Sequence, residues 1–525
     1  MKQRNILVTL GLLLVLLVPT KGFAEEIEEV IVVGATVQES VSNPNYEVSL
    51  SEVVMPAMPH FAGGYGGFAG YNERGTQTIH STVYVNGIPA NDSGSGWYDF
   101  AHDISTGSEG VKVVTGPNAV VYGSGSLGGA VFITDTIVPG ITVRGGDQHK
   151  FVNYQTGDDD LGLSVSAFDV SNGSVRTDNE EEDFYKNLTA KTLFDAGPLD
   201  VVASYTEYDY DYDNCYTASW SQSNDCLQEG ERGTVSARND NFTLGYTFNN
   251  SNYYTEGVQT TVNEASRTYF DARDVREVGN IMSITYGATY DQEEYNDNEA
   301  NNSSVYTYLN HSNISFGLRA TSDALVARLG LEKDNWFFNF GNSYRNPSLY
   351  ELNGDSWVVA NPNLEPEEAT GGEIGYGPLS VFSYNFSQGI DYDFETYQYM
   401  NTGSYNTKGV RFMDTYQIPW GGIMLMAGYT NSDQPRIPQW KAMINPFISV
   451  NGYRYELVYS TMVDRQPSLY DTALDDIQSL DFVVTKLFGD FEIGFRVEDI
   501  FDDEYEVLPG YGAGGRNFLL TITNR

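Results

Sequence analysis

Short segments that alternate apolar and polar residues follow one another from about residue 139 to the end of the chain. In NFTLGYTF (241–248) and FEIGFRV (491–497), the apolar side chains share one face of a strand and the polar or small ones share the other. A β-sandwich also alternates, but these segments lack the apolar runs of strands that are buried on both faces. The pattern is typical of a barrel that has lipid outside and water inside.

No apolar run after residue 24 reaches the roughly 18 residues that a membrane-spanning helix needs. A chain that crosses a membrane without such helices must close its strands into a barrel, because only closure pairs every backbone donor and acceptor within lipid. The chain holds 38 Tyr and 27 Phe at a mean hydropathy of −0.34, which suits strands with one wet face and aromatic girdles. Asn451-Gly452 and Gly489-Asp490 mark tight turns between strands.

The N-terminus has the three parts of a secretory signal: basic Lys2 and Arg4, an apolar run over 6–18, and small residues before Glu25. We expect residues 1–24 to be removed. The net charge of −42 makes nucleic acid an improbable partner. In an exported chain, the two cysteines, Cys215 and Cys226, are expected to form a local disulfide within a loop.

Glycine-rich motifs occur in a fixed order between residues 74 and 136: an Arg-Gly pair, VNGIP (85–89), Gly-Pro, VYG (121–123) and LGG (127–129). This order resembles the plug domain of TonB-dependent outer-membrane receptors, in which a plug closes a wide β-barrel. Two later segments, 344–376 and 497–522, resemble barrel strands of the same family. The plug-motif positions are Arg74, Gly75, Gly87, Gly116, Pro117, Gly123, Gly125, Gly128 and Gly129.

The resemblance implies a large antiparallel transmembrane β-barrel of about 22 strands with a small α+β plug inside its lumen. We expect the plug over residues 39–138 and the barrel over residues 139–525. A β-branched run lies directly after the signal, within a segment over 25–38 that resembles the TonB box and its linker. Such a run can stay extended and add to the sheet edge of a partner, here TonB. The box residues are Glu28, Glu29, Val30, Ile31, Val32, Val33 and Gly34.

In the family, the plug arginine of the Arg-Gly motif pairs with barrel glutamates, so Arg74 is expected to lock the plug to the wall through Glu351 or Glu373. A second plug arginine usually precedes the Gly-Pro motif, but here that position is Thr115. One arm of the lock is therefore expected to be missing. The plug is also short on its N-terminal side, and the chain ends on Thr-Asn-Arg rather than on an aromatic residue.

No enzyme chemistry is expected, and no catalytic residues are nominated. The chain has no G-x-S-x-G motif and its five His are scattered. Gly123–Gly128 formally matches G-x-G-x-x-G, but a strand rather than a helix follows it, so no dinucleotide cofactor is expected. The acidic stretch 91–103 lacks EF-hand spacing, and no metal site is assigned.

These features predict a TonB-dependent active transporter in the bacterial outer membrane. Its ligand is a scarce small molecule: a ferric siderophore, cobalamin or a carbohydrate. Haem receptors of the family that the chain resembles carry a His between similar Arg-x-Pro and Asn-Pro-x-Leu motifs. No His lies between Pro347 and Asn361 here, so haem is disfavoured. The alternative is a passive, porin-like channel with a vestigial plug. Further expected partners are outer-membrane lipid, lipopolysaccharide and the barrel-assembly machinery, and the barrel is expected to be a monomer.

Overall fold

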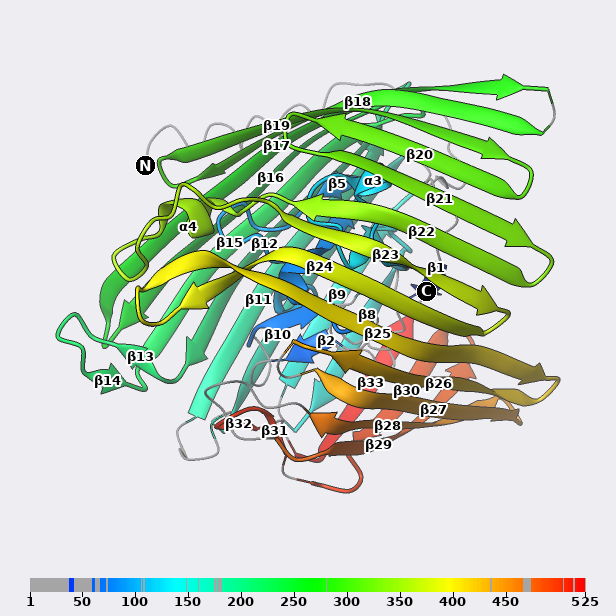
Figure 1. The fold of residues 1–525 in the computed structure, drawn as a ribbon. Helices are drawn as coiled ribbons and strands as arrows, with labels where there is room; N and C mark the ends of the chain where they lie inside the picture. The colour runs from blue at the N-terminus through cyan, green and yellow to red at the C-terminus, as the bar shows by residue number, and fades with distance from the viewer. Residues whose placement is uncertain are drawn as a thin grey trace.

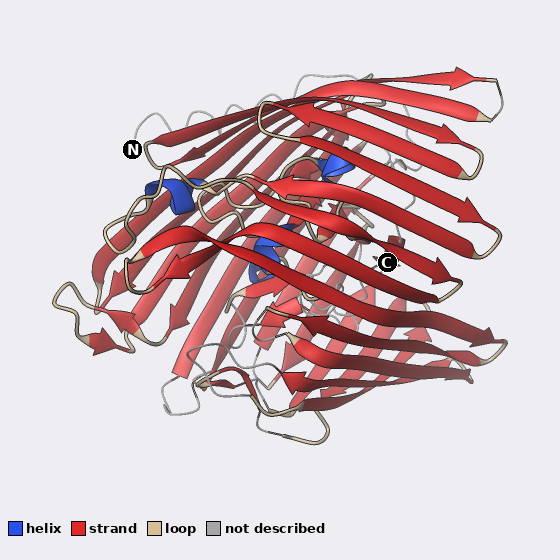
Figure 2. Ribbon diagram, viewed as in Figure 1, coloured by secondary structure: helices blue, strands red, loops and turns tan. Residues whose placement is uncertain are grey.

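A closed β-barrel surrounds a small domain in the computed structural model (Figure 1). The structure describes residues 37–41, 59–61, 67–71, 74–104, 106, 109–147, 149–158, 160–173, 176, 182–279, 281–434, 437–465, 474–503, 505–512 and 515–524. Within these residues, 22 strands close the barrel, every neighbouring pair is antiparallel, and β33 meets β8 to complete the ring. Strands dominate the molecule and its helices are few and short (Figure 2).

The barrel strands follow the chain in order. They are β8 (Gly140–Gly146), β9 (His149–Gly157), β10 (Leu161–Gly173), β11 (Glu182–Asp195), β12 (Asp200–Tyr212), β15 (Cys226–Arg238), β16 (Phe242–Thr255), β17 (Val258–Val278), β18 (Met282–Tyr295), β19 (Asn298–His311), β20 (Ile314–Thr321), β21 (Leu325–Lys333), β22 (Trp336–Arg345), β23 (Glu367–Tyr376), β24 (Leu379–Asp393), β25 (Gln398–Ile418), β26 (Gly421–Ser432), β27 (Pro438–Val450), β28 (Tyr453–Arg465), β29 (Ile477–Phe488), β30 (Phe491–Glu498) and β33 (Asn517–Asn524).

The two-residue alternation decides which face of each strand meets lipid. In β16, Leu244 and Tyr246 are exposed on the outside, whereas Thr243 and Thr247 are buried toward the lumen. The barrel therefore presents an apolar exterior and a polar interior, as the sequence predicts. Among the described residues, no helix is long and apolar enough to cross a membrane.

The enclosed domain is built on a five-stranded sheet in the order β1-β6-β7-β4-β5. Its core is the set of valines on β4, β6 and β7 together with aromatic residues such as Phe100. Its elements are β1 (Val37–Val41), β2 (Pro59–Phe61), β3 (Ala69–Tyr71), the 3₁₀ helix Thr78–His80, β4 (Ser81–Val85), β5 (Ile88–Pro89), the 3₁₀ helix Phe100–His102, β6 (Gly110–Thr115), α3 (Ala119–Tyr122) and β7 (Gly129–Thr134).

The boundaries differ slightly from the sequence-based ones. Val37 and Gln38, which we assigned to the linker, already belong to β1, because they pair with Val114 and Val113 of β6. The first barrel strand begins at Gly140. The short hairpin β4–β5 turns at Gly87, where φ is +85°.

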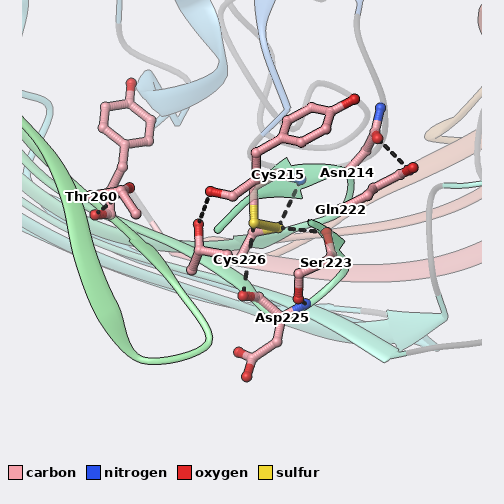
Figure 3. The surroundings of a disulfide bond; sticks show 10 residues. Asn214, Cys215, Gln222, Ser223, Asp225, Cys226 and Thr260 are labelled. Carbon is pink, nitrogen blue, oxygen red and sulfur yellow. Dashed lines mark hydrogen bonds between the residues drawn. A yellow bond between two sulfur atoms is a disulfide. The ribbon is translucent and has the colours of Figure 1, made fainter. Parts of the chain in front are cut away.

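One end of the barrel carries the longer connections, which marks it as the outer end. Residues 213–225 form a hairpin of β13 (Cys215–Tyr216) and β14 (Gln222–Ser223), which the Cys215–Cys226 disulfide ties to the start of β15 (Figure 3). Residues 346–366 contain α4 (Leu349–Asn353). Residues 499–516 contain the small pair β31 (Glu506–Leu508) and β32 (Tyr511–Gly512).

Gly129→Ala should loosen the plug sheet while the barrel stays folded. Gly129 has φ +142°, and a Cβ there would lie 2.1 Å from the carbonyl oxygen of Val114. The clash and the backbone strain should together cost about 2 kcal/mol. Faster amide hydrogen exchange in β6 and β7 would show it. Gly145→Ala on β8 is the control, since nothing lies within 4 Å of its Cβ; equal exchange in the two variants would contradict the prediction.

Candidate functional site

Arg74 joins the plug to the barrel wall through a buried, bidentate ion pair. Its Nη1 and Nη2 atoms each donate to one carboxylate oxygen of Glu373, on β23, at 2.7 Å. Nη1 also donates to the Tyr384 hydroxyl at 2.7 Å, and the guanidinium lies 5.0 Å from the centre of the Phe382 ring. The Thr407 hydroxyl donates to the Arg74 carbonyl at 2.6 Å. We call this Arg74–Glu373 contact the plug–barrel lock.

Glu351 is a correction to the sequence-based expectation, because it does not pair with Arg74. It is the third residue of α4, where it completes a capping box with Ser348. Its carboxylate accepts from Nη1 and Nη2 of Arg345 at 2.8 and 3.0 Å. Arg345 in turn donates through Nε to Glu367. The position of Glu351 in the first turn of α4 thus directs its carboxylate to Arg345 of the wall and not to Arg74.

His80 continues this charged network into the plug. Its Nε2 lies 3.0 Å from Glu367, while its Nδ1 accepts from the Gln77 backbone N–H at 3.2 Å. The Tyr405 hydroxyl lies 3.1 Å from the same Nδ1. Because Nδ1 accepts a hydrogen bond, Nε2 carries an N–H and donates a hydrogen bond to Glu367. Glu351, Arg345, Glu367 and His80 therefore connect the outer loop α4 to the plug.

A second attachment holds the plug at the Gly-Pro motif, where Thr115 replaces the expected arginine. Arg319 of β20 donates to the carbonyls of Val120 and Val121 at 2.9 and 2.8 Å. Arg328 of β21 donates to the Pro117 carbonyl at 2.5 Å. The cations here belong to the wall, and the plug supplies only backbone acceptors. We call these contacts the wall clamp.

Sequence reasoning missed the wall clamp. A signal is present in ISFGLRAT and LVARLGLEK, where the alternation puts Arg319 and Arg328 on the polar face, which must face the lumen in a spanning strand. The partners were invisible, because they are backbone carbonyls of α3 and the turn before it. The second arm is thus supplied by different residues rather than lost.

The remaining motif positions lie along the contact between plug and wall. Gly75 has φ +76°, and a Cβ there would lie 2.6 Å from Thr407 Oγ1. Gly116 has φ +82° and faces the Tyr384 hydroxyl. Gly123 and Gly125, both with positive φ, follow α3, and Gly128 and Gly129 lead into β7. The glycines let the plug backbone turn sharply against a crowded wall.

A cavity of about 450 Å³ lies between the outer tip of the plug and the barrel wall. The plug contributes residues 90–104, which contain the acidic stretch of the sequence, and the wall contributes β11, β12, β15, β16 and β17. Tyrosines line much of it. The aromatic lining residues are Phe68, Trp97, Tyr98, Tyr208, Tyr210, Tyr212, Phe248, Tyr253, Tyr295 and Tyr350.

Partly buried acids and one arginine join plug and wall inside this cavity. Arg232 donates to the Asp99 carbonyl at 2.8 Å and to Asp103 Oδ1 at 2.5 Å. Desolvation raises the pKa of Asp99 to about 6 and also raises the pKa of Asp103. Burial, with Arg232 nearby, lowers the pKa of His102, so this ring is neutral.

Two outer loops meet at a pair of tryptophans. Trp220, from the disulfide-tied hairpin, and Trp357, from the α4 loop, have ring centroids 4.1 Å apart in an edge-to-face arrangement. Tyr212, the last residue of β12, and Asp355, within the α4 loop, both line the cavity. The Trp220–Trp357 contact therefore links two loops that arise on separate parts of the cavity wall.

The TonB-box positions 28–34 lie outside the described residues. In the described part of the chain, no group of three or more His, Cys, Asp or Glu is placed to hold a metal ion. The plug–barrel lock, the wall clamp and the cavity together form the candidate site: a lumen plugged by hydrogen bonds, with a ligand-sized space on its outer side.

Residues 32–130 match the family model described as the TonB-dependent receptor plug domain. The chain is 23% identical to the vitamin B12 transporter BtuB of Vibrio cholerae over 88% of its own length and 86% of that protein's. It is 24% identical to BtuB of Photobacterium profundum over 69% and 66% of the two chains.

The fold is shared with solved receptors. The ferric enterobactin receptor PfeA, solved in complex with BCV-L6, matches with a TM-score of 0.74 at 14% identity, over 93% of this chain and 99% of that one. The siderophore receptor PirA from Acinetobacter baumannii matches with a TM-score of 0.70 at 13% identity, over 93% and 98%.

Glu373→Gln should weaken the plug–barrel lock, because it leaves the buried Arg74 charge uncompensated. Breaking such a pair costs about 3 kcal/mol, equivalent to roughly a hundredfold faster opening of the plug. Amide hydrogen exchange over residues 74–134 measures this. The matched control is Glu368→Gln, an exposed position on the same strand. Unchanged exchange in Glu373→Gln would show that the pair does not hold the plug.

Asp99 should make the plug less stable as the pH rises from about 4 to 6. The folded pKa of about 6 lies above the ordinary 3.8, so the unfolded chain loses its proton first and the free energy of unfolding falls across this window. Asp99→Asn should remove the effect, and at pH 7.5 it should be the more stable protein, by at most about 3 kcal/mol. Urea unfolding at pH 4.5 and 7.5, with the exposed Asp334→Asn as control, decides the sign.

Proposed function

We propose, from the membership of this chain in the TonB-dependent outer-membrane receptor family, that it actively imports a scarce small molecule across the bacterial outer membrane. The observation that carries the proposal is a lumen held closed by specific bonds between plug and wall. Arg74 with Glu373 and the wall clamp are buried contacts, and breaking a buried ion pair costs free energy. A ligand on the outer side therefore needs an external pull to pass.

The place of β1 suggests how that pull reaches the plug. β1 is an edge strand of the plug sheet and pairs only with β6 among the described strands. The proposed TonB box, Glu28 to Gly34, directly precedes it in sequence. A partner strand added to the box would load β1 first, and the plug would then rearrange in an order–disorder switch. Transport of this kind needs no covalent intermediate.

The relatives suggest classes of ligand but do not identify the ligand of this chain. The relatives named above are vitamin B12 transporters, and the solved structures named above are siderophore receptors. Cobalamin, a ferric siderophore and a carbohydrate therefore remain candidates for this chain. All three would meet the cavity at the outer tip of the plug before any movement of the plug.

The rival function is a passive channel that keeps a vestigial plug. Its sequence arguments were the short plug and Thr115 in place of a second arginine; at the Gly-Pro motif, Arg319 and Arg328 attach the plug from the wall. The similarity to dedicated transporters also favours import. Conductance across a planar bilayer separates the two functions: a steadily open pore would favour the channel.

Other partners follow from the surface. Exposed apolar residues such as Leu244, Val305 and Phe340 face outward from the barrel and would contact outer-membrane lipid, with lipopolysaccharide around the outer loops. The closing strand β33 is the segment on which the barrel-assembly machinery would act. A monomer is the simplest assembly, since one chain closes the barrel by itself.

Val32→Pro should abolish binding to the periplasmic domain of TonB. Proline removes the backbone N–H that a partner strand would use and so prevents strand addition. Pull-down of the purified receptor measures it. Val32→Thr, which keeps the branched side chain and the N–H, is the control and should bind. Equal capture of both variants, or of neither, would move the passive channel to first place.

A further inference from the structure

The cations of the cavity are already engaged. The described lining residues include five aspartates, Asp92, Asp99, Asp103, Asp135 and Asp355, and two cations. Arg232 is held by Asp103 and the Asp99 carbonyl, and it lies 5.4 Å from the centre of the Tyr98 ring. Lys191 Nζ lies 2.6 Å from Asp135 and 3.2 Å from Glu109. Both cations hold plug to wall, so an anionic ligand would have to break one of these pairs to gain a counter-charge.

The lining offers a ligand acceptors and hydroxyls, such as those of Tyr210, Tyr212 and Tyr253, which can donate or accept. Asn249 donates through Nδ2 to Asp92 at 3.0 Å, and this orientation is fixed because a carboxylate only accepts. Its buried Oδ1 has no hydrogen-bond partner among the described residues. The oxygens of Asp92, Asp103 and Asp135 already accept hydrogen bonds, but a carboxylate oxygen has a second lone pair that can accept from a ligand. A ligand that satisfies these acceptors must bring donors such as hydroxyls or amide N–H groups.

Ring faces supply the rest of the lining. Tyr208, Tyr210 and Tyr212 alternate along β12 and so share the lumenal face; Tyr210 and Tyr212 stack with centroids 5.7 Å apart. His102 of the plug stacks on Tyr208 at 3.5 Å. Trp97, at the tip of the plug, keeps 43% of its surface exposed. Such a wall favours a ligand with flat ring faces over a compact ion.

The net charge of the protein also disfavours the binding of an anionic ligand. A net charge of −42 places a repulsive field in front of an approaching anion. Many of the arginines sit inside the lumen in pairs with acids or on carbonyls, as Arg74, Arg319 and Arg345 do. They give no help to an anion at the mouth.

We propose that the cavity binds an uncharged ligand that is rich in hydrogen-bond donors and carries ring faces, and that it rejects anionic ferric chelates. An oligosaccharide or an amide-bearing corrinoid has this chemistry; a ferric triscatecholate, with three negative charges, does not. The inference rests on the importer function proposed above and names the substrate class of that site.

The test is equilibrium binding to the purified full-length receptor in detergent. Three probes are compared at low ionic strength: maltohexaose and cyanocobalamin, both uncharged, and a ferric triscatecholate. At least one neutral probe should bind about tenfold or more tightly than the ferric complex. Asn249→Ala should weaken that neutral probe roughly tenfold, because it removes the free acceptor. Asn301→Ala, exposed on the outer face of β19, is the matched control and should not.

A second variant removes two negative charges from the lining. Asp92→Asn combined with Asp355→Asn should raise affinity for the ferric complex about tenfold at low salt, and the gain should vanish at high salt. Asp334→Asn combined with Asp490→Asn removes two exposed charges from turns at the opposite end of the barrel and should have no effect. Because each change is isosteric, loss of folding does not confuse the result.

Three outcomes would overturn the assignment: tighter or equal binding of the ferric complex in the wild type, no binding of either neutral probe, or no gain from the double aspartate variant. None of these measurements involves TonB. If the receptor binds a neutral probe but Val32→Pro still captures TonB, the importer mechanism fails while the substrate class stands. If neither neutral probe binds but Val32→Pro abolishes TonB capture, the substrate class fails while the importer mechanism stands.

Discussion

Pairing every backbone hydrogen bond within lipid is the constraint on which this structure depends. A strand in the bilayer has no water to satisfy its edges, so the sheet closes on itself through β33 and β8. Closure around 22 strands leaves a lumen too wide for side chains to fill. The inward half of each alternating strand is therefore polar, and a separate domain must occupy the space.

Once the lumen is lined by polar groups, electrostatics decides how the plug sits there. Arg74 brings a positive charge from the plug to Glu373, and Arg319 and Arg328 bring positive charges from the wall to carbonyls of the plug. Both arrangements satisfy groups that are costly to bury alone. The cations of the outer cavity are likewise paired with acids and carbonyls, so they are not free to bind an anion. The attachment of the plug therefore also affects what the cavity can bind.

Much of this could be predicted from one sequence, and the errors have a physical pattern. Alternation between faces is local, so the barrel and its polar interior were predicted from segments such as 241–248. Pairing between distant residues is not local. Glu351 and Glu373 were equal candidates for Arg74, but Glu351 caps α4 and turns to Arg345. Thr115 suggested a lost attachment. The acceptors of Arg319 and Arg328 are backbone carbonyls, which every residue has, so the sequence does not show which carbonyl an arginine will bind.

The sequence by itself determined the all-β membrane class, the order of plug and barrel, and the inward face of strands such as β16, since these follow from composition, period and motif order. Only the tertiary structure decided which charge meets which, because residues about 300 positions apart, such as Arg74 and Glu373, become neighbours through the closed ring alone. It also decided the cavity, whose walls come from the plug tip and from strands that share no motif. Local patterns can be read from the sequence, whereas the contacts between plug and wall form only when the barrel closes.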